Sequence, residues 1–123
     1  MKPSSAKNKG RLLQQWTRDK ILQTFPELEP DDVRSVSMGA AGEDILFSAA
    51  AGQRLGISVE CKSRDRIAVY GYFTQAQQNT PAAREPVVVI KQNRSSPLVV
   101  IDAEYYFRLL KGIPCELAEC PTK

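Results

Sequence analysis

Two acidic residues and one lysine stand at the polar ends of short apolar segments. Asp44 opens the segment 45–47, and the segment 57–61 contains Glu60 and leads to Lys62. Because side chains alternate between the two faces of a strand, Glu60 and Lys62 share one face. If Asp44 lies alongside, two carboxylates and one ammonium converge. That combination suits the binding of Mg²⁺ and the orientation of a water molecule against a phosphodiester.

The elements that must position these residues are predicted to be two strands of a hairpin. The strands cover residues 42–48 and 55–62, and a turn of small residues joins them at 49–54. Cys61 is expected on the face opposite Glu60, as a core side chain. The chain contains no histidine, which excludes a Ser-His-Asp triad and a histidine-dependent metal nuclease. Acid–base work falls to Asp, Glu, Lys, Tyr or Cys.

Periodicity and turn residues predict further elements on both sides of this hairpin. They are a helix at about 9–24, a strand at 33–38, a helix at 67–79, strands at 87–90 and 98–101, and a helix at 103–111. The continuous β-branched run at 87–90 is typical of a strand buried on both faces. We therefore expect an α/β fold with a mixed central β-sheet of about five strands flanked by helices.

Length and composition predict one domain. With 123 residues the chain can form a single modest core; we expect a disordered basic arm at 1–8, the domain at 9–112 and an irregular tail at 113–123. No apolar run approaches the ~20 residues of a membrane helix, and no signal peptide is evident, so we expect a cytoplasmic protein without membrane contact. The three cysteines are expected to be reduced.

Positive charge is concentrated at the start of the chain. The first 20 residues contain six lysines and arginines against one aspartate, which favours a polyanionic partner such as DNA. The alternative is a solubilising segment. The basic candidates for phosphate contacts are Lys7, Lys9, Arg11 and Arg18, with Lys91 and Arg94 in the turn after the strand 87–90.

Several other side chains have both a functional and an ordinary interpretation. Gln75 and Gln78 in the helix 67–79 either contact DNA or are solvated helix formers. Trp16 is expected in the core or in a dimer interface, and not as a platform for base stacking. Asp44, Glu60 and Lys62 also have an ordinary interpretation, as an ion-pair cluster at the end of a sheet.

Three short motifs together resemble the PD-(D/E)XK nuclease superfamily, and within it the small Holliday junction resolvases. They are Lys9-Gly10 near the start of the first helix, Gly42-Glu43-Asp44-Ile45, and Val59-Glu60-Cys61-Lys62. The resemblance covers about residues 9–110 and includes the order of the later helix and strands. It implies a restriction-endonuclease-like core and a magnesium-dependent endonuclease, with Mn²⁺ able to substitute.

The resemblance also implies roles for individual residues. Asp44 and Glu60 resemble the metal ligands, with the backbone carbonyl of Cys61 as a third. Lys62 resembles the residue that orients or activates the attacking water, and Ser37 is placed to touch the scissile region or to support Asp44. The family implies a homodimer that cuts branched DNA symmetrically.

The chain departs from the family pattern at two positions. Glu43 stands where a proline often precedes the first aspartate; it is either a surface substitution or an extra acidic group near the metal. Gln14 stands where resolvases commonly have a glutamate on the first helix. An amide adds no charge to a metal site but can hold a water molecule by hydrogen bonds, so Gln14 remains a candidate site residue.

Two alternatives to the resolvase interpretation stay open at this point. One is another endonuclease of the same superfamily, acting on flaps, nicks or ordinary duplex in repair or restriction. The other is a nucleic-acid-binding module on a nuclease scaffold that has lost its chemistry.

Overall fold

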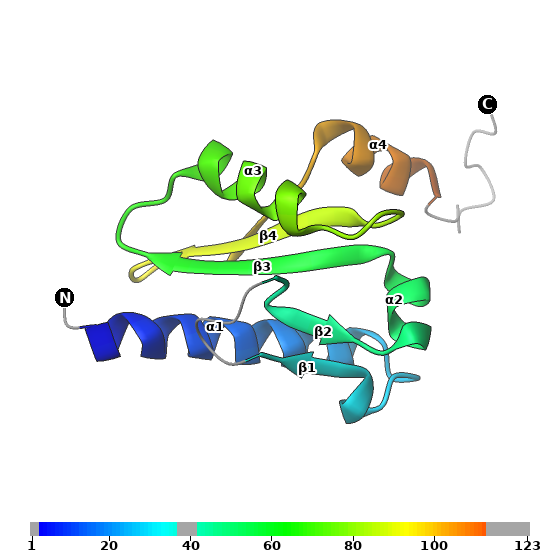
Figure 1. Ribbon diagram of the computed structural model, residues 1–123, viewed down its shortest axis with the longest axis horizontal. Helices are drawn as coiled ribbons and strands as arrows, with labels where there is room; N and C mark the ends of the chain where they lie inside the picture. The colour runs from blue at the N-terminus through cyan, green and yellow to red at the C-terminus, as the bar shows by residue number, and fades with distance from the viewer. Residues whose placement is uncertain (1–2, 37–41, 113–123) are drawn as a thin grey trace, which may run out of the picture.

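The computed structural model describes residues 3–36 and 42–112, and its helices and strands follow one another as Figure 1 shows. In chain order they are α1 (Pro3–Thr24), the short 3₁₀ helix η1 (Pro30–Asp32), β1 (Val33–Ser35), β2 (Ile45–Phe47), α2 (Ala49–Leu55), β3 (Ile57–Arg64), α3 (Val69–Asn79), β4 (Glu85–Gln92), β5 (Leu98–Val100) and α4 (Ala103–Gly112). The α/β class predicted from the sequence is confirmed.

The described strands form two small sheets, so the prediction of one sheet of about five strands is wrong. β1 pairs antiparallel with β2, while β3 pairs parallel with β4 and β4 pairs antiparallel with β5. The two sheets approach each other at Asp44, whose backbone N–H donates to the carbonyl of Val59 over 3.0 Å. β2 then turns away from β3 toward β1.

The predicted hairpin of residues 42–62 is also wrong, because a helix replaces its turn. Ser48 caps the N-terminus of α2 by accepting a hydrogen bond from the Ala51 N–H over 3.1 Å. Gly56 ends the helix in the left-handed conformation, with φ of 66°. A capping serine before alanines and a glycine after them is the signature of a short helix.

The first helix begins earlier than the sequence analysis predicted. α1 starts at Pro3 instead of near residue 9, so residues 3–8 are helical and the expected disordered arm is wrong for them. Proline is favoured in the first turn of a helix, where its missing N–H would have no helical partner. The predicted tail at 113–123 lies outside the described residues. No described helix is both long and apolar enough to cross a membrane.

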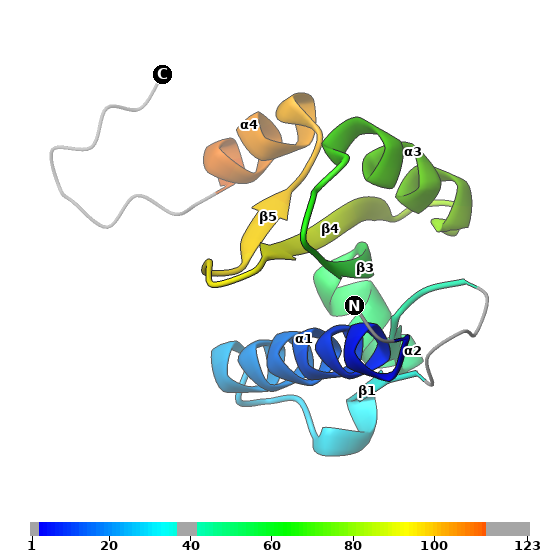
Figure 2. The same ribbon diagram turned by 90° about the vertical axis from the view of Figure 1, so that its left-hand side faces the viewer.

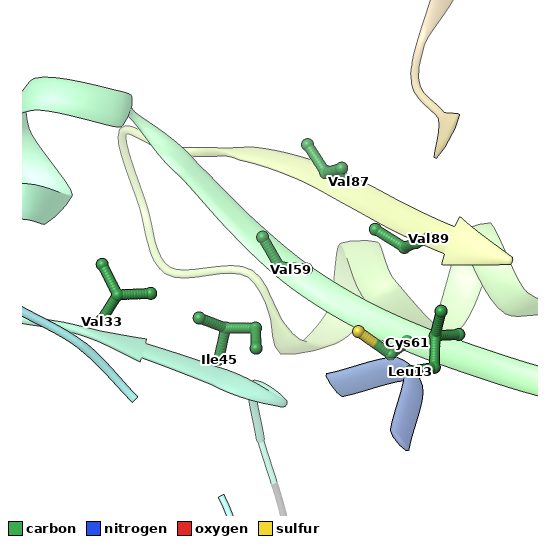
Figure 3. Packing of buried hydrophobic residues seen from close by; sticks show 7 residues of the cluster. All are labelled: Leu13, Val33, Ile45, Val59, Cys61, Val87 and Val89. Carbon is green, nitrogen blue, oxygen red and sulfur yellow. The ribbon is translucent and has the colours of Figure 1, made fainter. Parts of the chain in front are cut away.

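β3 and β4 lie between α1 on one face and α3 on the other (Figure 2). The α1 face holds the larger core cluster, which Figure 3 shows: Leu13, Val33, Ile45, Val59, Cys61, Val87 and Val89. The α3 face holds a smaller cluster of Ala76, Val88 and Ile90. Strand alternation divides β3 and β4 between these two clusters.

Candidate functional site

Glu60 and Lys62 both face α3, so the sequence prediction that they share a face of β3 is confirmed. Asn79 of α3 donates its side-chain N–H to Glu60 Oε2 over 3.4 Å. Lys62 Nζ lies 5.4 Å from the ring centroid of Tyr72, also on α3. Val59 lies in the core cluster on the opposite face. The pleat of β3 thus separates two charged side chains from the apolar interior.

Asp44 is held at β3 by two backbone contacts. Its own N–H donates to the Val59 carbonyl, and the Cys61 N–H donates to Asp44 Oδ2 over 2.7 Å. The second contact is a hydrogen bond to an ionised acceptor, the stronger kind. Because Cys61 stands between Glu60 and Lys62 in the chain, this bond fixes the Asp44 carboxylate beside both of them.

Burial raises the pKa of both carboxyl groups. For Asp44 the loss of hydration raises the pKa, while the Cys61 N–H, Lys62 and Arg64 lower it by smaller amounts. For Glu60, which is only 4% exposed, burial raises the pKa and the charge of Asp44 raises it further. The charge of Asp44 therefore disfavours the ionised form of Glu60.

Lys62 provides the positive charge of the site. Among the described residues it makes no ion pair within 4.0 Å, and its ammonium lies over the Tyr72 ring. It lowers the pKa of both Asp44 and Glu60. The ammonium is therefore attracted by the electron-rich face of a ring and not by a carboxylate.

Glu43 is a further acidic group beside the site, and its side chain is only 16% exposed. Its Oε2 lies 3.6 Å from Arg84 Nη1 and has no hydrogen-bond partner in the described part of the chain. Its charge raises the pKa of Glu60. Of the two interpretations of Glu43, the structure favours an acidic group near the site. Gly52 makes room for this pair, because a Cβ there would lie 2.9 Å from Arg84 Cζ.

Gln14 and Cys61 are buried in the protein. Gln14 is 3% exposed on α1, and its side chain interacts within the protein. The Cys61 thiol lies 3.6 Å from Thr17 Oγ1, and burial raises its pKa to about 12, so the prediction of a core thiol is confirmed. Ser37 lies outside the described residues.

The candidate DNA contacts are distributed over several elements. Lys7 and Arg11 are exposed on α1, and Gln75 and Gln78 are exposed on α3. Arg94 lies in the turn between β4 and β5, whereas Lys91 lies within β4, paired with Ser63, and not in the turn as predicted. Lys9 contacts that same turn, donating to Asn93 Oδ1 over 2.9 Å.

Arg18 differs from the other basic candidates. It donates from Nε to the Val33 carbonyl over 2.8 Å and from Nη2 to the Pro30 carbonyl over 3.2 Å. Its guanidinium therefore ties α1 to η1 and β1, which leaves fewer donors for a phosphate.

The sequence analysis missed three residues of this region. They are Asn79, which donates a hydrogen bond to Glu60, Tyr72, whose ring lies near the Lys62 ammonium, and Arg84, which pairs with Glu43. All three reach the site from outside the motifs. No local sequence pattern identifies contacts between residues this far apart in the chain.

The donor set fits a metal that takes few protein ligands. Within residues 3–36 and 42–112, no group of three His, Cys, Asp or Glu side chains is arranged to hold a metal ion. Asp44 raises the pKa of Glu60, and a divalent cation bound by both carboxylates would oppose that effect. Mg²⁺ commonly uses one or two carboxylates and keeps several waters.

Comparison of the chain with protein-family models, with curated proteins and with solved structures returned no significant match.

Proposed function

We propose that this protein is a magnesium-dependent DNA endonuclease. The observation that carries the proposal is the placement of Asp44 beside Glu60 and Lys62 on one face of β3, fixed by the Cys61 N–H bond to the Asp44 carboxylate. Both acids have raised pKa values, and perturbed acids grouped with a cation are typical of functional sites. Such a site serves phosphodiester hydrolysis, which needs charge stabilisation more than a covalent nucleophile.

Each residue has a separate task in this proposal. Asp44 and Glu60 would hold the metal, with the Cys61 carbonyl as a further oxygen ligand, and Asn79 orients Glu60. Lys62 donates hydrogen bonds to the attacking water and to the phosphate. When bound, Mg²⁺ supplies positive charge for the transition state and makes water more acidic. The attacking water loses a proton to solvent as its oxygen forms a bond to phosphorus, the bond to the leaving oxygen breaks, and the leaving oxygen takes up a proton from solvent.

The finer proposal is that the substrate is branched DNA, such as a four-way junction, cut by a homodimer. Its supports are the resemblance in the three motifs and the cations along α1 and the β4–β5 turn, since a branched duplex presents phosphates in several directions. Mn²⁺ is expected to substitute for Mg²⁺.

The test compares Lys62→Ala and Asp44→Asn with wild type on a labelled four-way junction, a flap and a linear duplex. We expect each variant to bind DNA and to cleave it more slowly by at least ~10²-fold, because each loses charge stabilisation in the transition state. Lys111→Gln, which removes an exposed cation of α4, is the matched control and should cleave normally. Wild-type rates for purified Lys62→Ala would overturn the mechanism. Two symmetric cuts in the junction would support the resolvase assignment.

A non-catalytic DNA-binding module is the second candidate, favoured because no three acidic side chains of the described residues are arranged to hold a metal ion. The melting temperature separates the two candidates. A metal site predicts that Mg²⁺ or Mn²⁺ raises it and that Asp44→Asn abolishes the rise. A module without metal predicts no change and no cleavage of any substrate.

A further inference from the structure

A cavity of about 720 Å³ lies between α1 and the turn that joins β4 to β5. Its volume is in the range of pockets that bind small organic molecules. Ser63 lines it and follows Lys62 directly in β3. By strand alternation the cavity is therefore on the face of β3 opposite Glu60 and Lys62. It is separate from the candidate metal site, yet one residue away along the same strand.

One side of the cavity is apolar and aromatic. Leu12 and Trp16 of α1 line it together with Pro97. Leu12 is 51% exposed and Trp16 is 43% exposed, so the indole is not a core side chain. Lys20 Nζ lies 5.6 Å from the centroid of the Trp16 ring, and the part of the indole that stays open in the cavity can stack on a flat ligand.

The other side of the cavity is cationic. Lys91 and Arg94 line it, and among the described residues neither makes an ion pair within 4.0 Å. Lys9 closes one end, where it contacts Asn93 and lies 3.6 Å from Asp65. Lys9 is therefore partly neutralised, while Lys91 and Arg94 leave uncompensated positive charge next to the indole.

We propose that this cavity binds an unpaired nucleotide of the DNA substrate, with its base stacked on Trp16 and its phosphate bound by Lys91 and Arg94. An aromatic platform beside a cationic groove is the arrangement that binds single-stranded nucleic acid. A base inside a duplex is already stacked and cannot enter. The inference rests on the proposed function and narrows it to substrates that carry unpaired nucleotides. It also replaces the expectation that Trp16 does not stack on bases.

Trp16 is the only tryptophan of the chain, so intrinsic fluorescence reports on this cavity directly. The titrant is an oligothymidylate of about ten nucleotides, within the range of single-strand site sizes, added to wild type in EDTA. We expect saturable quenching by the oligonucleotide and none by a blunt duplex at equal phosphate concentration. Quenching by thymidine monophosphate at millimolar concentration would support the same pocket with a free nucleotide as its ligand. Binding of the oligonucleotide without any change in fluorescence would overturn the proposal.

Variants test the same inference by the anisotropy of a labelled oligothymidylate. Trp16→Ala should weaken binding by about 5- to 100-fold, and Trp16→Phe should restore much of it, because stacking contributes at this level. Arg94→Gln should weaken binding more than Lys111→Gln, which removes the same charge from α4. Circular dichroism confirms that each variant is folded. Equal affinity for wild type and folded Trp16→Ala would overturn the proposal.

The two proposals fail in different ways. Fluorescence and anisotropy are measured without metal, so they do not depend on catalysis. Quenching with no cleavage of any DNA would support the cavity assignment and overturn the endonuclease. Cleavage with no quenching would overturn the cavity assignment alone.

Discussion

The two faces of β3 differ in what burial does to their side chains. On the α1 face, Val59 and Cys61 are buried among apolar neighbours, and burial stabilises the fold at about 25 cal/mol per Å² of apolar surface. On the α3 face, Glu60 is buried to a similar degree, 4% exposed against 1% for Val59. There burial raises the pKa of the carboxyl group and disfavours its ionised form.

Alternate residues of β3 therefore contribute to the protein in different ways. On the α1 face, the Val59 and Cys61 side chains contribute to the free energy of unfolding and contact none of the side chains proposed for catalysis. The α3 face holds charges that would be more stable in water, and it holds them where a cation could relieve them. Stability and chemistry are therefore separable by substitution at neighbouring positions.

The largest stability effect is expected from Val59→Ala. The residue is 1% exposed in the main core cluster, so its truncation should lower the free energy of unfolding by roughly 2 kcal/mol through lost burial and a cavity. Cleavage per folded molecule should stay near the wild-type rate. Urea unfolding monitored by Trp16 fluorescence measures the first effect. A loss of cleavage comparable to that of Lys62→Ala in folded protein would show that the two faces are not separable.

In the absence of metal, Glu60→Gln is expected to increase the stability of the protein, by less than Val59→Ala decreases it. The raised folded-state pKa means that the folded protein holds the proton more tightly than the unfolded chain. Stability is therefore lost as pH rises from the ordinary value of 4.5 through the raised pKa. Glu60→Gln removes this charge and should raise the melting temperature at pH 7 by roughly 2–5 °C. This rise is counted after subtracting any difference between the variant and wild type that remains below pH 4.

Asp32→Asn is the matched control for this linkage. Hydrogen bonds from Ser48 and from the Glu29 N–H lower the pKa of Asp32. Its contribution is present above the ordinary value of 3.8 and lost as pH falls through the lowered pKa. The Asn variant should therefore be less stable than wild type at pH 7. We expect Glu60→Gln to stabilise the protein and Asp32→Asn to destabilise it. If both substitutions stabilised the protein, or neither did, the proposed difference between the two carboxyl groups would be wrong.

The smallest effect on cleavage is expected from a change of the Cys61 side chain. Its pKa of about 12 and its burial predict no reaction with a thiol reagent at pH 8 while the protein is folded. A variant with Cys115 and Cys120 replaced by serine isolates this thiol, and urea should expose it. Rapid labelling of the folded variant would contradict the burial of this face. Cys61→Ser, which keeps the backbone carbonyl and N–H, should cleave at nearly the wild-type rate.

Strand periodicity was sufficient to predict the faces of β3 from the sequence. Alternation placed Glu60 and Lys62 together and Cys61 opposite, and the β-branched run at 87–90 predicted a buried β4. These are local signals, because a residue's face depends only on its position in the strand. The class of the fold followed from the same patterns.

The pairing of strands was beyond local signals. The residues 49–54 were interpreted as a turn because they are small, although Ser48 and Gly56 mark the ends of a helix. Once α2 is present, β2 pairs with β1 instead of continuing along β3. Asn79 and Trp16 contact segments that are far away in the chain, and such contacts cannot be predicted from local patterns in a single sequence.

The parallel pairing of β3 with β4 has a consequence for how the protein folds. Ile57 is paired with Glu85. The segment between them, which includes α3 and its flanking loops, must therefore close into a loop before β3 and β4 can pair. Contacts between residues this far apart in the sequence slow folding, because the chain loses entropy on closing the loop before the paired strands stabilise it. The face that holds Glu60 and Lys62 is completed only when α3 docks on the paired strands. The grouping of Asp44, Glu60 and Lys62 is therefore expected to form late in refolding, after the isolated helices.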